Sequence, residues 1–228
     1  MELMERYRQA VEELLAKVRD TQTERIIEAG RLIADAVSSG GKIYLSGICH
    51  SIEMDLIYRG GGPIFYKEYK PGETELKEGD VLFVSSVSGR TKSVVDLAWD
   101  CMQKGITVIA LTSMVYASKV DPVHESGKKL HEFVTLALDN CAPAAEAMLE
   151  VEGLEAHFAA SSGIASDYIM WSLTSVCVEK MLRDGFTPGI LKSANFPGGN
   201  DWLHPDQDGH RRFALCLYYQ LLTLPCRF

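Results

Sequence analysis

The sequence lacks the patterns that mark several large classes of protein. No two of its six cysteines are spaced as C-x-x-C, so the paired-cysteine pattern of zinc ribbons and thioredoxin-like sites is absent. The longest apolar run, near residues 168–178, is shorter than the ~20 residues that span a bilayer. Neither the P-loop motif G-x-x-x-x-G-K-[ST] nor the dinucleotide fingerprint G-x-G-x-x-G occurs.

Positive charge is also scarce. The chain carries 23 Lys and Arg against 31 Asp and Glu, which gives a formal net charge of −8. This balance predicts no nucleic-acid partner and no anionic-membrane partner. A small anionic ligand stays compatible with it, because a local cluster of hydrogen-bond donors outweighs a diffuse negative field.

The N-terminal stretch MELMERYRQA is charged and helical, unlike a secretory signal. Several of the six cysteines lie in apolar stretches, where a free cysteine behaves as a small hydrophobic residue. We therefore expect buried, reduced thiols and a cytoplasmic location.

An apolar stripe begins at the N-terminus. Over residues 2–19 it recurs at helical spacing, at Leu3, Tyr7, Val11, Leu14 and Val18. Thr21 and Glu24 then form the capping-box pattern T-x-x-E, which predicts a second helix that ends at Gly40 and Gly41. Residues 1–40 are thus predicted to form a helical hairpin that packs on the rest of the chain.

Apolar segments of strand length follow, separated by helical segments. The predicted strands cover residues 42–46, 63–69, 81–86, 106–113 and 133–139. Several are apolar throughout, which is typical of parallel strands covered on both faces. The sequence predicts an α/β fold, a three-layer sandwich around a mainly parallel five-stranded sheet. One domain over residues 41–203 holds this sheet, and the pattern leaves open the structure of a tail at residues 204–228.

Polar loops follow two of these strands, at the carboxyl edge where parallel sheets bind ligands. The first loop reads SGICHS (residues 46–51) and the second reads SSVSGRTKS (residues 85–93). Each leads into a helix, so it offers backbone N–H groups and the positive end of a helix dipole to an anion. A helix cap needs one hydroxyl, whereas the second loop has four near the helix start. The two loops therefore predict a phosphate cradle.

Acid–base groups lie beside the first loop. An imidazole such as His50 titrates near neutral pH and can move protons, and Glu53 follows in the first turn of the next helix. The plainer alternatives are that His50 bonds to backbone and that Glu53 only complements the helix dipole. As candidates for a catalytic base, His50 and Glu53 come first in this sequence.

The stretch VLFVSSVSGRTKSVVDLAWDCMQKGITVIALTS resembles the core of the SIS (sugar isomerase) domain family, in which a strand ends in S-x-S-G-x-T. The first loop, LALDNCAPAAEAML and ILKSANFPGGND are similar to a bacterial group within it described as phosphoheptose isomerases. The resemblance implies a flavodoxin-like strand order and a phosphosugar ligand. It assigns the phosphate to Ser51, Ser86, Ser88 and Thr91. The wider ligand site would add Gly47, Gly89 and Ser113.

The resemblance implies a sugar-phosphate isomerase that interconverts aldose and ketose through an enediolate. The His and acidic ligands of the zinc-dependent phosphoheptose isomerases have no match in this sequence, so we predict no metal or other cofactor. The resemblance also implies a homo-oligomer, either a dimer or a tetramer. Two alternatives stay open: a phosphosugar-binding module without turnover, which would act as a sensor, and a lyase acting on an amino-sugar phosphate. The chain departs from the family at Cys49, where glycine is usual, and the carboxylate that would move the proton has no matched position.

Overall fold

A computed structural model describes residues 2–193 and 195–197, and the predicted tail at residues 204–228 lies outside them. Five strands form the main sheet: β1 (Ile43–Ser46), β2 (Tyr66–Glu68), β3 (Val81–Ser85), β4 (Thr107–Thr112) and β5 (Leu136–Asp139). All four pairings within it are parallel, and the strand order is β2-β1-β3-β4-β5. The predicted α/β fold, its five strands and the flavodoxin-like order are confirmed.

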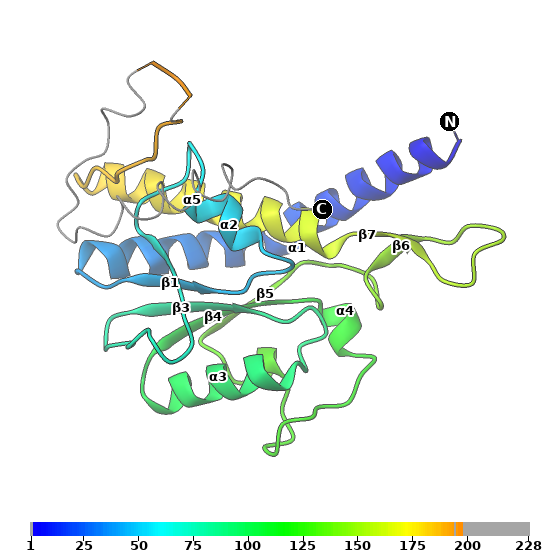
Figure 1. The fold of residues 1–228 in the computed structure, drawn as a ribbon, viewed down its shortest axis with the longest axis horizontal. Coiled ribbons are helices and arrows are strands. Elements are labelled where there is room, and N and C mark those ends of the chain that lie inside the picture. The colour runs from blue at the N-terminus through cyan, green and yellow to red at the C-terminus, as the bar shows by residue number, and fades with distance from the viewer. Residues whose placement is uncertain (1, 194, 198–228) are drawn as a thin grey trace, which may run out of the picture.

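The helices cover the sheet on both faces, which makes the predicted three layers (Figure 1). They are α1 (Glu2–Ser38), α2 (Ile52–Ile57), α3 (Lys92–Gln103), α4 (Met114–Ala117) and α5 (Ser162–Arg183). A 3-10 helix covers Leu130–Glu132, and β6 (Ala147–Leu149) pairs with β7 (Phe158–Ala160) as a separate antiparallel hairpin. Among the described residues, none of the helices is both long and apolar enough to cross a bilayer.

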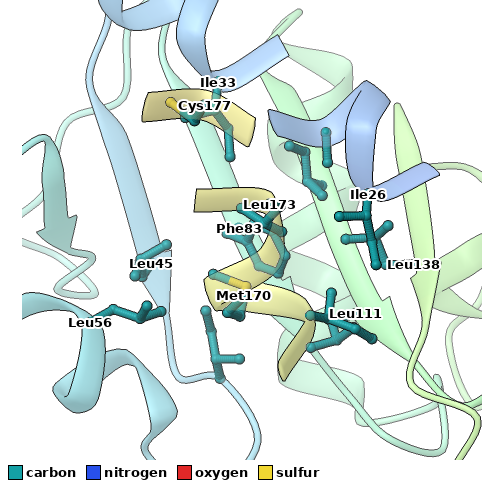
Figure 2. Packing of buried hydrophobic residues seen from close by; sticks show 14 of the residues in the cluster. Ile26, Ile33, Leu45, Leu56, Phe83, Leu111, Leu138, Met170, Leu173 and Cys177 are labelled. Carbon is teal, nitrogen blue, oxygen red and sulfur yellow. The ribbon is translucent and has the colours of Figure 1, made fainter. Parts of the chain in front are cut away.

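The hydrophobic core is split by the sheet. On one face α1 and α5 pack over the strands, and Figure 2 shows Ile26 of α1 beside Leu138 of β5 and Leu173 of α5 beside Phe83 of β3. On the other face α3 packs through Val95 and its neighbours. Since every residue of β3 is buried, this strand is covered on both sides, as its wholly apolar sequence predicts.

The N-terminal hairpin expected from the sequence is wrong, because residues 2–38 form the single helix α1. The hydroxyl of Thr21 donates to the carbonyl of Lys17 one turn earlier, so it does not cap a new helix. No glycine or proline precedes Gly30 to interrupt the helix. The buried stripe of α1 continues through Gln22, whose side chain accepts a hydrogen bond from the backbone of Asp139 in β5. Tertiary packing therefore holds one continuous helix across the predicted break.

The two long helices touch closely at Gly30. A Cβ atom at this position would lie 2.6 Å from the carbonyl oxygen of Leu173 and 2.7 Å from the Cβ of Val176, both on α5. Real Cβ atoms do not approach other atoms this closely, so α1 and α5 would have to separate.

We predict that Gly30→Ala destabilises the protein by about 1–3 kcal/mol, because it overpacks the contact between α1 and α5. Helix propensity alone predicts the opposite sign, a gain of up to about 1 kcal/mol. Gly163→Ala is the matched control, since a Cβ there meets nothing within 4 Å. Urea unfolding of the three proteins measures the difference, and a Gly30→Ala variant as stable as the control would contradict the prediction.

Candidate functional site

The first loop, which follows β1, has a strained backbone. Gly47, Cys49, His50 and Ser51 all have positive φ angles, and three of them are not glycine. For residues other than glycine, a left-handed backbone conformation costs free energy, and such residues cluster at functional sites. The backbone N–H of Ile48 donates to the Glu53 carboxylate at 2.7 Å, and this bond holds the loop against the start of α2.

The second loop is closed by its own hydroxyls. Ser86 Oγ and Thr91 Oγ1 are 2.8 Å apart, and the Thr91 backbone N–H donates to Ser86 Oγ at 3.2 Å. Gly89 has a φ of 68°, and a Cβ there would lie 3.1 Å from the Thr112 hydroxyl, so glycine suits this position. Among the described residues, no hydrogen bond to the Ser88 side chain is found.

Neither loop uses its hydroxyls as helix caps. Ser51 stands at the N-cap of α2 and Thr91 at the N-cap of α3, and neither side chain bonds to the helix that follows. This geometry removes the plain explanation of these residues as caps. Ser113 differs, because it is fully buried, accepts a bond from Tyr116 N–H and donates to the Ala142 carbonyl at 2.6 Å. Its hydroxyl is engaged in holding α4 and the next loop.

Cys49 joins three elements at the base of the site. Its Sγ lies 2.9 Å from Ser85 Oγ at the end of β3 and 3.2 Å from Ser166 Oγ in α5. Burial raises the pKa of the Cys49 thiol, and the nearby hydroxyls only partly offset this effect. The residue that replaces the usual glycine is therefore a neutral, buried contact between the first loop, the sheet and α5.

A carboxylate that the sequence analysis did not single out, Glu146, lies beside the first loop. Its Oε2 accepts a hydrogen bond of 2.6 Å from Ser162 Oγ, at the start of α5, and lies 3.3 Å from His50 Nε2. Its backbone carbonyl accepts bonds from both the N–H and the hydroxyl of Ser161. Nothing in its local sequence marks Glu146, since 96 residues separate it from His50 and folding alone brings them together.

The two predicted acid–base residues, His50 and Glu53, thus have different surroundings. His50 is close to Glu146 at the tip of the first loop, whereas the Glu53 carboxylate is turned back onto Ile48 N–H. Among the described residues, no group of three His, Cys, Asp or Glu is placed to hold a metal ion. The polar groups of the two loops, with His50 beside the Glu146 carboxylate, can form hydrogen bonds to a small ligand.

Comparison with known proteins identifies the class to which this fold and these loops belong. The SIS domain family matches residues 6–71 and 66–113, which contain most of α1 and both loops. The UPF0309 protein ABC0887 of Shouchella clausii is 30% identical over 92% of this chain and 98% of that protein. The UPF0309 protein of Streptomyces griseus is 31% identical over 83% of this chain and 87% of that protein. The chain therefore belongs to the UPF0309 family of SIS-domain proteins.

Solved structures share the fold at lower identity. A Bacteroides fragilis protein described as a phosphosugar isomerase involved in capsule formation superposes with a TM-score of 0.57, at 22% identity, over 82% of this chain and 92% of that one. The Vibrio vulnificus NanR protein complexed with ManNAc-6P gives a TM-score of 0.55 at 17% identity, over 80% and 65%. The phosphoheptose isomerase of Neisseria gonorrhoeae gives 0.52 at 13%, over 77% and 95%.

We predict that the Cys49 thiol reacts slowly in the folded protein, because burial raises its pKa and the thiolate is the reactive form. Iodoacetamide at neutral pH should label Cys49 more slowly in native protein than in urea, because the raised pKa leaves less of the thiolate in the folded state. Peptide mass spectrometry after timed quenching measures both rates. Equal labelling in the two conditions would show that the thiol is open to solvent.

Proposed function

We propose that this protein binds a sugar phosphate at the carboxyl ends of β1 and β3 and interconverts its aldose and ketose forms. The observation that carries the proposal is that the hydroxyls of Ser51 and Thr91 stand at two helix starts without capping them. Hydroxyls at such positions can donate to an anionic ligand. The structure of NanR with ManNAc-6P, which shares the fold, supports a phosphosugar as that ligand.

The phosphate would lie at the N-terminus of α3, the longer of the two helices that follow the loops. The helix dipole and the free N–H groups there favour an anion despite the net charge of −8. In this proposal Ser51, Ser88 and Thr91 donate to phosphate oxygens. Ser86 holds the loop closed through its bond to Thr91 and faces the same ligand.

The glycines of the two loops support close approach of the ligand. Gly47 and Gly89 both have positive φ angles, and neither adds a side chain between the backbone and a phosphate. Ser113 lies behind the second loop, since its N–H donates to the Val87 carbonyl. We infer that Ser113 shapes the ligand site from behind.

In this proposal His50 takes part in the chemistry of isomerisation. Its side chain is 71% exposed at the loop tip and lies against the Glu146 carboxylate. An imidazole there can pass a proton between the two sugar oxygens as the carbonyl moves from one carbon to the next. Glu53, the other candidate from the sequence, has the different task of holding Ile48.

A binding module without turnover is the second candidate. It is favoured by the structure of NanR, which shares the fold and holds a phosphosugar. The hydroxyl groups of the two loops also explain ligand binding without requiring a catalytic reaction. Thermal-shift screening of aldose and ketose phosphates identifies ligands, and NMR of each hit over time then separates the two candidates. Ligand binding with conversion supports the isomerase, and ligand binding without conversion supports the module.

We predict that Ser88→Ala weakens binding of the best phosphosugar about tenfold or more, because a hydrogen bond to a charged group contributes about 1.5–3 kcal/mol. The fold should be unchanged, since no described residue bonds to the Ser88 side chain. Ser172→Ala is the control, because its hydroxyl bonds only to the Tyr168 carbonyl of its own helix. Isothermal calorimetry measures the affinities, and an unchanged affinity for Ser88→Ala would refute the phosphate cradle.

We also propose that the protein is a homo-oligomer. In the apolar stripe of α1, Leu14 and Val18 are buried in the domain, but Leu3 and Tyr7 are 38% and 39% exposed. Figure 1 shows why, since the N-terminal end of α1 projects beyond the sheet. A second copy of the chain would cover this continuation of the stripe.

We predict that light scattering gives at least twice the chain mass at micromolar concentration. The double variant Leu3→Asp and Tyr7→Asp should shift the protein towards the monomer, because it places two charges in the apolar contact. Gln9→Asp adds charge on the opposite side of α1 and should leave the mass unchanged. A monomeric wild-type protein would overturn the proposal.

A further inference from the structure

We propose that Glu146 is the base that moves the proton between adjacent sugar carbons, an assignment that rests on the isomerase function proposed above. Glu146 lies between β5 and α5, outside both loops that the sequence indicates. It is the carboxylate that contacts the tip of the first loop, through His50. Four features of Glu146 support this role. Two serines at the start of α5 hold it in place, its backbone is strained, and one of its carboxylate oxygens has no hydrogen bond among the described residues. The fourth is that Glu53, the alternative base, is engaged elsewhere.

The start of α5 holds the Glu146 carboxylate in place. Ser162 Oγ donates to Oε2 at 2.6 Å, which fixes one oxygen of the group. The N–H and hydroxyl of Ser161 donate to the backbone carbonyl of Glu146 at 3.0 Å and 2.7 Å. Because Ser161 and Ser162 are themselves completely buried, both ends of the residue are anchored to rigid structure.

The backbone that presents Glu146 is strained. Ala145 and Glu146 are consecutive residues with φ angles of 62° and 70°, a conformation that non-glycine residues rarely adopt. A fold with only a packing need at this turn would favour glycine here. With glutamate at this strained position, a carboxylate lies against His50. Backbone strain of this kind is typical of functional positions.

One oxygen of the carboxylate remains for a substrate. The bonds to Ser162 and His50 both use Oε2, and no described residue hydrogen-bonds to Oε1. The side chain is 25% exposed, so the carboxylate group is partly open to a small molecule and mostly shielded from bulk water. By contrast, the Glu53 carboxylate is tied to the backbone of the first loop.

The reaction balances with the groups present. Glu146 takes the proton from C2 of the open-chain aldose phosphate, the C–H electron pair forms the C1–C2 double bond, and O1 receives a proton from His50. The enediol then loses its O2 proton to His50, and the C2 carbonyl forms. The proton on Glu146 exchanges with solvent while the enediol lasts, and Glu146 then gives a proton to C1, which is a deuteron in D₂O. No oxidant, reductant or further reactant is needed, and both residues end as they began.

The test compares deuterium incorporation from D₂O with binding, for Glu146→Gln and two other variants. Glutamine keeps an oxygen for Ser162 but cannot take the carbon-bound proton, so exchange should fall about 100-fold or more. Calorimetry should show affinity within about threefold of wild type, because the phosphate contacts remain. Glu152→Gln makes the same chemical change at an exposed position of the turn between β6 and β7 and should exchange normally.

Glu53→Gln discriminates between the two carboxylates. Because Glu53 acts through the first loop, its substitution should weaken binding and exchange together. Loss of exchange with intact binding in Glu53→Gln, together with normal exchange in Glu146→Gln, would assign the base to Glu53 and overturn the inference. A wild-type protein that binds phosphosugars without exchange would overturn the isomerase function itself, and the role of Glu146 with it.

Discussion

The parallel pairing of β1 with β3 is the constraint on which the rest of the site depends. Ile43 to Ser46 pair in register with Val81 to Val84, so both strands end at the same edge of the sheet. The chain order reverses at this point, since β2 lies on the other side of β1. Parallel sheets open a crevice at such a reversal. The two hydroxyl-bearing loops meet there because the strands before them lie side by side.

A buried polar network ties this edge to α5. It runs from Ser85 through Cys49 to Ser166, and Asn140 Nδ2 donates to Ser166 Oγ at 3.2 Å. Asn140 in turn accepts a bond from the Ala142 N–H. Hydrogen bonds in the protein interior are electrostatically stronger than the same bonds in water, because water does not compete with them. The network therefore sets where α5 begins relative to the first loop, and through Ser162 it sets the place of Glu146.

The sequence was a reliable guide where local pattern and tertiary environment agree. All five strands lie within or at the bounds predicted from apolar runs, because a strand covered on both faces needs apolar residues throughout. It failed at Thr21 and Glu24, where a capping pattern stands within a continuous helix. A capping box is a local signal, and packing of α1 on α5 and β5 outweighs it. The β6–β7 hairpin was also missed, because strands of three residues show too little alternation to recognise.

The sequence by itself determined the layer architecture and the two loops, because hydrophobic period and clustered hydroxyls are properties of short segments. Only the tertiary structure decided which hydroxyls are engaged within the protein, as Ser113 is, and which have no hydrogen bond among the described residues, as is the case for Ser88. It also decided the contact between His50 and Glu146, since chain folding brings these residues together and no spacing in the sequence marks them as a pair. The physical reason is that a side chain's role follows from its partners in space, and these come from the whole sheet and from α5 at once.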